Sequence, residues 1–342
     1  MIIKIFVVFL CILFSATVFA QKKSRPAKTV RAASQQPSVL TQMQNAPAPI
    51  FVAESSPALQ TLVNKAAAET INRFAAKGFQ PDNLAITLID LRDPNNLKQA
   101  DFHGEFKIYP ASVVKLFYLA AAHRWLEDGK IRDTPELRRG LKEMIVESYN
   151  DATHYILDVL TDTSSGAELS EKELEKFAFK RHAVNRYFAA LGYQNINACQ
   201  KTYCEDAYGR EQQFRGKNGI NRNKLTTNAT ARLMTEIALG KAVNAKRSAE
   251  MMELLKRDFA GESKDKDDQA HGFTGIALKN MKGAKLWSKA GWTSTTRHDA
   301  AYIETASGDK FVLVIFTEKF SSERDIIPNV ARIILNEINL IK

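Results

Sequence analysis

The chain has 342 residues, which is long for one domain and too short for two large ones. Its composition, 45% hydrophobic and 25% charged, is ordinary for a globular protein with a sizeable core and excludes a chain that is disordered throughout. The formal net charge of +10, of which Lys4 supplies one, indicates either nucleic acid or an anionic surface as a partner.

The first twenty residues have the pattern of a secretory signal peptide. An apolar run follows Lys4, and small residues then lead to Ala20, after which we expect cleavage. The alternative, an uncleaved membrane anchor, needs about 18 or more apolar residues, and Ser15 and Thr17 interrupt this run. We therefore expect a periplasmic or secreted protein, and export favours an anionic surface over nucleic acid, so no nucleic acid partner is predicted.

Residues 21–56 are rich in Gln, Ser, Ala, Pro and Lys and show no sustained apolar period. Such a segment cannot build a core, so we predict a disordered tether ahead of one domain at 57–342. Its basic residues precede the first acid, Glu54, and are Lys22, Lys23, Arg25, Lys28 and Arg31. Weak association of residues 22–31 with an anionic envelope is a hypothesis, and a solvated basic tail is the alternative.

The predicted elements of the domain begin with a helix from Pro57 to Gly78. Its apolar residues recur at spacings of three and four: Leu59, Leu62, Val63, Ala66, Ala67, Thr70, Ile71 and Phe74. Residues 84–90 form a predicted strand, and a turn at 94–96 leads to a second strand around 99–104.

The middle of the chain is predicted to be helical from Ser112 to about Ala189, with breaks near 129–135 and 163–166. A polar loop follows from about 194 to 224, and loops of this length are usually functional or disordered. Cys199 and Cys204 lie in this loop. An exported protein permits a disulfide between them, and two free thiols are the alternative.

Helices are predicted again at 227–239 and 245–259, and strands at 285–289, 300–304 and 311–316. A last helix has the apolar face Ile326, Ile327, Val330, Ile334, Leu335 and Ile338. This order predicts an α+β fold: an antiparallel sheet flanked by the N- and C-terminal helices, with an inserted all-helical subdomain. The α/β part is expected at about 57–111 and 275–342, and the helical part at about 112–274.

The segment from Tyr109 to Phe117 has the sharpest chemical pattern. Pro110 and Ser112 mark a helix start, and Lys115 shares a face of the first turn with Ser112. A hydroxyl there lies at the positive end of the helix dipole, beside an amine that can take its proton. The lysine must be neutral to act as a base, which requires partial burial or nearby positive charge. A helix cap followed by a solvated lysine is the alternative.

Two further short motifs follow along the chain. Ser148-Tyr149-Asn150 comes after the helical stretch 141–147, and Lys289-Ala290-Gly291 closes a strand ahead of Trp292. Each motif alone is more often a cap, a turn or a surface charge. A helix start, a helix junction and a strand end can nevertheless converge at an interface between structural parts, where ligand pockets tend to lie.

The order Ser-x-x-Lys, Ser-x-Asn and Lys-x-Gly resembles that of penicillin-recognising serine enzymes, and the flanking sequence resembles class A β-lactamases in particular. Residues 141–160 are similar to the helical segment around their Ser-Asp-Asn motif. Residues 288–316 are similar to their Lys-Thr-Gly strand and the strand pair after it, and 325–338 to their last helix. The resemblance covers roughly 58–342, is weak between 161 and 223, and implies a β-lactamase/transpeptidase-like fold.

This resemblance implies a hydrolase that forms an acyl-enzyme on Ser112. The backbone N–H groups of Ser112 and Trp292, the latter next to Gly291, would form the oxyanion hole. Lys115 would assist proton transfer, and Ser148 would relay a proton to the leaving nitrogen.

The remaining motif residues would bind substrate. Asn150 would bind the substrate amide, and Lys289 would hold both Ser148 and an anionic substrate group. Tyr149 replaces the usual aspartate of the second motif. Ala290 replaces a hydroxyl residue and so removes a hydrogen bond to a substrate carboxylate, and Trp292 is bulky at the mouth of the site. These departures put penicillin affinity in doubt.

The deacylating glutamate of the family lies on a loop ahead of a helix start with two threonines, here Thr226-Thr227. Glu211 lies at a suitable distance before it and would activate water, and Glu205 is a second candidate. The loop is lengthened, however, and Phe214 or Arg215 stands where an amide partner is expected. A solvated loop acid is the alternative for Glu211.

Arg297 is a further candidate cation for a substrate carboxylate, and an ordinary surface arginine is the alternative. The six histidines show no metal-ligand spacing, so neither a metal nor a cofactor is implied. The leading prediction is hydrolysis of a small β-lactam or peptidoglycan-like substrate by a monomer. The alternatives are a D,D-peptidase or esterase with slow deacylation, and a non-catalytic cell-wall-binding protein on the same fold.

Overall fold

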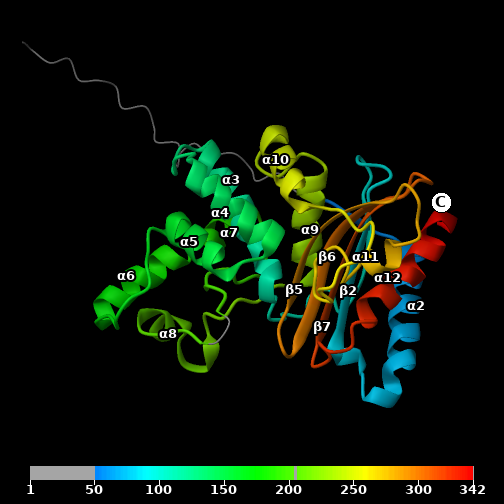
Figure 1. Ribbon diagram of the computed structural model, residues 1–342, viewed down its shortest axis with the longest axis horizontal. Helices are drawn as coiled ribbons and strands as arrows, with labels where there is room; N and C mark the ends of the chain where they lie inside the picture. The colour runs from blue at the N-terminus through cyan, green and yellow to red at the C-terminus, as the bar shows by residue number, and fades with distance from the viewer. Residues whose placement is uncertain (1–50, 204–205, 342) are drawn as a thin grey trace, which may run out of the picture. The chain divides into compact units, whose positions relative to one another are not determined.

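The computed structural model describes residues 51–203 and 206–341, which belong to one compact unit (Figure 1). The predicted signal peptide and its cleavage after Ala20 lie outside the described residues, as do the basic residues 22–31 and most of the predicted tether. Glu205 and Cys204 lie outside them too, so the disulfide between Cys199 and Cys204 stays a prediction.

The described residues form a seven-stranded sheet with the order β1-β3-β2-β7-β6-β5-β4. The strands are β1 Glu54–Ser55, β2 Leu84–Asp90, β3 Lys98–Phe102, β4 Lys256–Arg257, β5 Lys285–Trp292, β6 Thr296–Glu304 and β7 Lys310–Glu318. All neighbours pair antiparallel, as predicted, except β1, which pairs parallel with β3. Because the N–H groups of Glu54 and Ser56 donate to the carbonyls of Leu97 and Gln99, the end of the predicted tether is part of the sheet.

Two helices cover one face of the sheet, as the apolar patterns predict. Helix α2, Pro57–Phe74, is capped by Ser56, whose hydroxyl accepts from the N–H of Leu59. Helix α12, Ile326–Glu337, packs beside α2 on the right of the sheet in Figure 1. Their buried apolar faces form one core with alternate residues of the central strands, including Leu88, Ile303 and Leu313.

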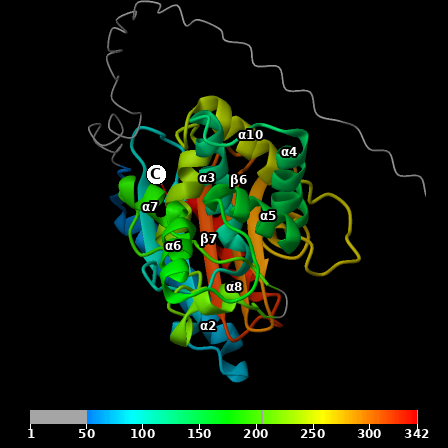
Figure 2. The same cartoon turned by 90° about the vertical axis from the view of Figure 1, so that its left-hand side faces the viewer.

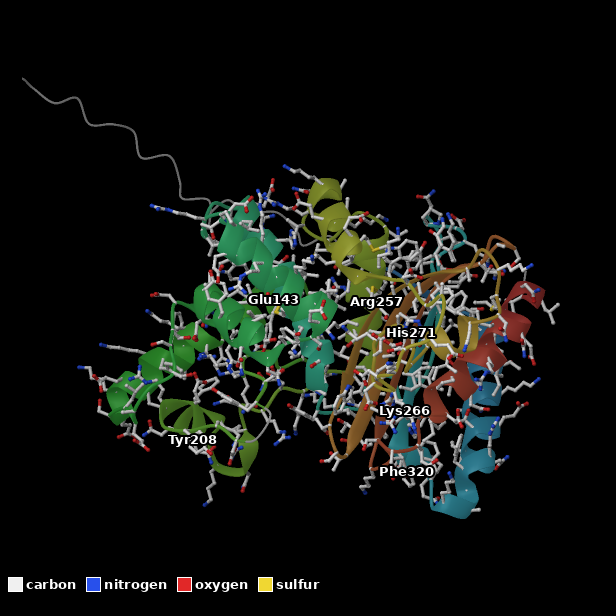
Figure 3. The ribbon with its side chains drawn as sticks, viewed as in Figure 1. Glu143, Tyr208, Arg257, Lys266, His271 and Phe320 are labelled. Carbon is white, nitrogen blue, oxygen red and sulfur yellow. The ribbon has the colours of Figure 1, made fainter. Side chains whose placement is uncertain are left out.

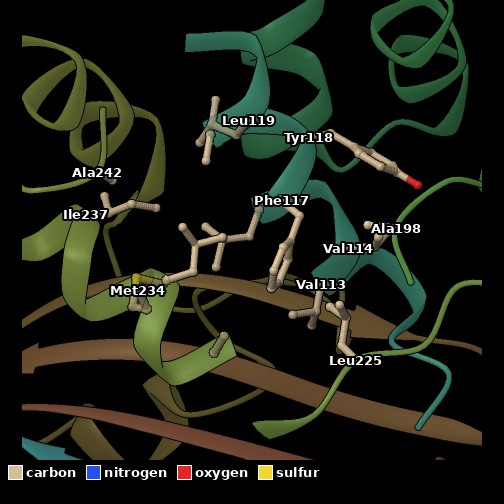
Figure 4. Close-up of a cluster of buried hydrophobic side chains, with 14 of the residues drawn as sticks. Val113, Val114, Phe117, Tyr118, Leu119, Ala198, Leu225, Met234, Ile237 and Ala242 are labelled. Carbon is tan, nitrogen blue, oxygen red and sulfur yellow. The ribbon is translucent and has the colours of Figure 1, made fainter. Parts of the chain in front are cut away.

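The opposite face carries the helical part, which faces the viewer in Figure 2. Its helices are α3 Lys115–Glu127, α4 Pro135–Lys142, α5 Asn150–Thr161, α6 Glu171–Arg181, α7 Ala183–Ala190, α9 Thr227–Ala238 and α10 Ala245–Leu255. A second core joins these helices to the sheet, and Figure 4 shows Phe117 of α3 and Met234 of α9 within it. Residues in these two cores lose their contact with water, which is the main stabilising contribution to such a fold.

Three elements differ from the sequence prediction. Helix α10 ends at Leu255 because Lys256 and Arg257 pair with β5 as β4. Strand β6 begins at Thr296 rather than near 300. Its first residues are polar but buried, and the sequence pattern does not indicate this burial. The loop predicted at 194–224 contains a short helix, α8 Arg210–Arg215.

The range 112–274 is not purely helical, because β4 falls within it and α9 packs on β2, β6 and β7. After β4 the chain runs through a loop to a short helix, α11 Gly275–Leu278, and then into β5. In the described residues no helix is long and apolar enough to cross a membrane.

Candidate functional site

Ser112 lies in a 3₁₀ turn, Ala111–Val114, that leads directly into α3. The residue before it, Ala111, has φ +46°, a left-handed conformation that a residue with a side chain rarely adopts. Ala111, Val113 and Val114 are buried, so packing holds the strained turn in place while Ser112 stays partly exposed. The predicted helix start is therefore present, and its first turn is 3₁₀ rather than α.

Gly291 of β5 packs directly against this turn. A Cβ atom on Gly291 would lie 2.7 Å from Ser112 N and 2.8 Å from both Pro110 O and Val113 N. These are backbone atoms, so no rotation of a side chain could make room. The absence of a side chain at Gly291 is what lets the strand reach the backbone of Ser112.

The Trp292 N–H points to the same edge of β5 as the Ala290 N–H. Successive N–H groups point to alternate edges of a strand. The N–H of Thr293 donates to Thr296 O at the β6 edge, and the N–H of Ala290 donates to Gln269 on the opposite edge. The N–H of Trp292 follows Ala290 by two residues, so the two expected oxyanion donors, from Ser112 and Trp292, lie at one junction.

Lys115 connects Ser112's helix to the second motif. Its ammonium donates to the carbonyl of Ser148, to Ser148 Oγ at 3.3 Å and to Asn150 Oδ1 at 2.9 Å. The Lys115 side chain is fully buried, so the sequence alternative of a solvated lysine is wrong. Ser148 and Asn150 flank the start of α5, and this junction brings both side chains onto one amine.

Lys289 reaches the same hydroxyl from the other side. Its Nζ lies 2.9 Å from Ser148 Oγ and also donates to Ala290 O at 2.7 Å. Burial lowers the pKa of Lys289 well below its ordinary value, and the charges of Lys115 and Arg257 lower it further. Ser148 Oγ thus lies between two lysines, which the motif order predicted as residues of one site.

A π-helical turn, Glu143–Glu147, and a left-handed Ser148 (φ +60°) shape this junction. Arg257 fixes it to the sheet: its guanidinium donates to Ile145 O at 3.0 Å and to Ser288 O at 2.8 Å. Figure 3 shows Arg257 between the helical part and the strands. Arg257 was missed by the sequence analysis, because its partners are carbonyls of distant residues.

Gln269, in the loop after β4, was missed as well. Its Nε2 donates to Ile145 O at 3.0 Å and to Val146 O at 2.7 Å. Its Oε1 accepts from Lys289 Nζ and from the N–H of Ala290. One amide therefore joins the turn before Ser148 to the Lys-Ala-Gly motif.

His298 ties the sheet to the segment before Ser112. Its Nδ1 accepts from the N–H of Thr317, so its Nε2 carries the proton and donates to Tyr109 O at 2.9 Å. Burial lowers the pKa of His298 to about 4, so the ring is neutral. This histidine supports the Ser112 turn from the side of β6.

The long loop approaches the site at Thr202, another residue that the sequence did not single out. Thr202 Oγ1 donates to Asn150 Oδ1 at 2.8 Å, the oxygen that also accepts from Lys115. The loop is fixed behind this point by Asn223, which hydrogen-bonds to the backbone of Cys199 and Gln200. The loop predicted as functional or disordered is therefore ordered on both sides of the undescribed residues.

Glu211 lies on α8 and is buried, so a solvated loop acid is excluded. Its Oε1 accepts from Arg181 and from Ser165 Oγ, and Lys201 Nζ lies 3.3 Å away. Arg181 and Lys201 also bind Asp158 of α5. The four charged residues form a buried ion cluster, of which only Asp158 is partly exposed, and Ser165 bonds to it from the surface. The role of Glu211 as a general base stays a prediction.

Arg297 is buried on β6, on the sheet face that α2 and α12 cover. Its Nη1 donates to Asp267 at 2.7 Å and its Nη2 to Gly272 O at 2.6 Å, and it lies 3.9 Å from the centre of the Phe273 ring. Lys289 and Gly291 face the other way, toward the helical part. Arg297 is thus not an ordinary surface arginine, and its role in binding a carboxylate stays a prediction that these contacts do not favour.

In the part of the chain that the structure describes, no group of His, Cys, Asp and Glu side chains is arranged to hold a metal ion. The donors that do converge are two lysines, two serines, an asparagine and the N–H groups of β5. Such a set can stabilise a developing oxyanion and move protons around a serine nucleophile.

Comparison with known proteins gives a family and a fold. The family model described as the Beta-lactamase enzyme family matches residues 66–338. A β-lactamase from Sphaerobacter thermophilus is 18% identical with a TM-score of 0.59, over 81% of this chain and 98% of that one. No curated protein matches the chain.

Two further solved structures have the same fold. A mutant of PBP-A, in an acyl-enzyme complex with penicillin G, is 16% identical with a TM-score of 0.59, over 85% of this chain and 100% of that one. A TLA-1 extended-spectrum β-lactamase mutant is 12% identical with a TM-score of 0.58, over 81% and 99%. At these identities the likeness establishes the fold alone.

Proposed function

The chain belongs to the Beta-lactamase enzyme family and has the β-lactamase/transpeptidase-like fold, and from this premise we propose that it hydrolyses β-lactam amides through an acyl-enzyme on Ser112. Family and fold identify a serine β-lactamase or penicillin-binding-protein-like hydrolase. The finer proposal rests on one observation: Ser148 Oγ is hydrogen-bonded by both Lys115 and Lys289, beside a Ser112 turn that Gly291 contacts directly.

Acylation begins at Ser112. Its Oγ forms a bond to the carbonyl carbon of the lactam, and its proton passes to a neutral Lys115 Nζ. The carbonyl oxygen gains negative charge and is stabilised by the N–H groups of Ser112 and Trp292. The close approach of Gly291 supports this step, because the two donors belong to different elements and must keep a fixed separation.

Ser148 completes the step. As the carbon–nitrogen bond breaks, Ser148 gives its proton to the leaving nitrogen and recovers one from Lys115, so the protons balance. Lys289 supports this transfer, because a lysine with a depressed pKa is a stronger acid and a stronger hydrogen-bond donor to Ser148. Water then hydrolyses the ester and restores Ser112.

A second candidate function is a peptidase or esterase whose acyl-enzyme persists. The contacts of Glu211 favour it, because its Oε1 is held by Arg181, Lys201 and Ser165. A carboxylate oxygen held by these three partners is better placed to anchor α8 than to activate water. The two candidates share acylation and differ in the rate of deacylation.

The test follows turnover and covalent modification together. The purified protein is mixed with a chromogenic cephalosporin and, separately, with a labelled penicillin, and the intact mass is measured. Ser112→Ala should abolish both signals, while Ser294→Ala, an exposed serine two residues after Trp292, should retain the parent's behaviour.

Turnover that requires Ser112 supports the β-lactamase. A persistent adduct on Ser112 without turnover supports the peptidase or esterase. A parent protein that stays unmodified contradicts both candidates and leaves a non-catalytic binding protein on this fold.

A further inference from the structure

The amide of Gln269 has both ends engaged at the site. Two backbone carbonyls, of Ile145 and Val146, accept from its Nε2 at 3.0 and 2.7 Å. On the other end, Oε1 accepts from Lys289 Nζ and, at 3.2 Å, from the N–H of Ala290. The side chain therefore spans the gap between the turn before Ser148 and strand β5, and its four hydrogen bonds fix its orientation.

The two donors that Oε1 occupies are those suited to an anion. A buried ammonium and an outward-pointing N–H at a strand edge would together hold a carboxylate, with charge-assisted hydrogen bonds. In this protein an uncharged amide oxygen takes that place. An incoming carboxylate would have to displace Gln269 and leave the carbonyls of Ile145 and Val146 without this donor.

Two neighbouring residues that the sequence analysis considered as partners of such a carboxylate do not support it. Ala290 has no hydroxyl, and Arg297 is bound to Asp267 and Gly272 on the opposite face of the sheet. Asp299, across from Ala290 on β6, lies on that opposite face as well, where its carboxylate accepts from the N–H of Thr274 at 3.2 Å.

We propose that Gln269 is a specificity-determining residue that closes the anion position at Lys289, so that Ser112 accepts acyl donors uncharged at that position, such as esters and neutral amides. This inference rests on the proposed acylation of Ser112. It adds a substrate class: the group of the substrate that reaches β5 meets an amide and carries no carboxylate.

The test compares benzylpenicillin with its methyl ester, which differ in the charge of this group and in one methyl group. The second-order rate constant for acylation of Ser112 is measured by intact mass for both compounds. In the parent the ester should react faster. Gln269→Ala should lower the ratio of the ester rate to the acid rate about tenfold, because the carboxylate gains access to Lys289 and the N–H of Ala290. Gln269→Glu should raise the ratio, because it puts a negative charge at the same place.

The ratio separates specificity from general damage, since a displaced Ser148 would slow both compounds equally. Gln213→Ala is the matched control: Gln213 also bridges backbone groups, those of Leu169, but in the helical part. Its ratio should equal the parent's. An unchanged ratio in Gln269→Ala, with both compounds still acylating Ser112, overturns the inference. Absence of acylation by either compound in the parent contradicts the proposed function instead.

Discussion

Ser148 Oγ is the point at which the site's charges meet. Lys115 and Lys289 approach it at 3.3 and 2.9 Å, and both lysines are fully buried. Burial lowers the pKa of Lys289 well below its ordinary value, and the charges of Lys115 and Arg257 lower it further.

Gly291→Ala tests whether the contact between β5 and the Ser112 turn sets the oxyanion hole. The added Cβ would lie 2.7 Å from Ser112 N, so the turn and the strand must separate. Loss of one oxyanion donor costs about 100- to 1,000-fold in rate, and we expect a loss of acylation of that order, measured by stopped-flow with a chromogenic cephalosporin. Gly140→Ala is the control, since its added atom meets only side-chain atoms, those of Tyr155 and Ile156, and it should react like the parent. Parent-like acylation by Gly291→Ala would show that the contact is dispensable.

The motif residues were predictable because their chemistry depends on short spacings along the chain. Ser112 and Lys115 share one turn, and Ser148 and Asn150 share one junction. Gln269 and Arg257 were not predictable, since each bonds to carbonyls more than a hundred residues away. Every residue has a backbone carbonyl, so the sequence does not indicate which carbonyl a polar side chain in a loop will bind.

At the scale of elements, the buried ion cluster joins α5, α6 and α8. Asp158, Arg181 and Glu211 come one from each helix, and Lys201, to which Ser165 bonds, completes the set. The two cations share two carboxylates, so each charge is balanced within the cluster. This balance holds the long loop against the helices and so positions Thr202 beside Asn150.

Glu211→Gln is expected to destabilise the fold by about 3 kcal/mol, because it leaves Arg181 and Lys201 with one carboxylate between them in a buried site. Urea unfolding measures this change. Glu175→Gln, an exposed glutamate on α6, should change the free energy of unfolding by less than about 0.5 kcal/mol. Deacylation is measured on the same variant while it is folded. A variant as stable as the parent refutes the structural role, and one that deacylates as fast as the parent refutes the role as a base.

The long amphipathic elements were predictable, whereas the short ones were not. Helices α2 and α12 show their apolar faces in the sequence and form where expected. Helix α8 has six residues, too few for a period to emerge, and it is held by the ion cluster. Lys256 and Arg257, near the end of the helix predicted at 245–259, are residues that suit a helix, but they pair with the edge of β5 instead.

At the scale of the whole molecule, the described residues form two large cores on opposite faces of one sheet and a small third cluster of Phe177, Cys199 and Phe214, and His298 lies where the sheet meets the site. Its pKa of about 4 in the folded state compares with 6.5 for an ordinary histidine. The unfolded chain therefore binds a proton below about pH 6.5, while the native protein does so only below about pH 4. Neutral His298 therefore contributes fully to the free energy of unfolding above about pH 6.5, and this contribution is lost as the pH falls from about 6.5 to about 4.

Urea unfolding at about pH 7.5 and about pH 5 tests this linkage. His298 alone should lower the free energy of unfolding by about 2 kcal/mol over that interval. His298→Gln keeps a donor for Tyr109 O and cannot be protonated, so its loss should be smaller than the parent's by about that amount. Equal losses of the free energy of unfolding in parent and variant would mean that His298 takes up a proton as readily in the native protein as in the unfolded chain.

The pairing of β2 with β7 has a consequence for folding during synthesis. Strand β2, near the start of the described chain, lies between β3 and β7, and Leu84 pairs with Thr317 more than 200 residues later. Until residues 310–318 leave the ribosome, β2 has one open edge and α2 has no α12 to cover it. The sheet can therefore close only when synthesis is nearly complete, and contacts this distant in sequence form slowly.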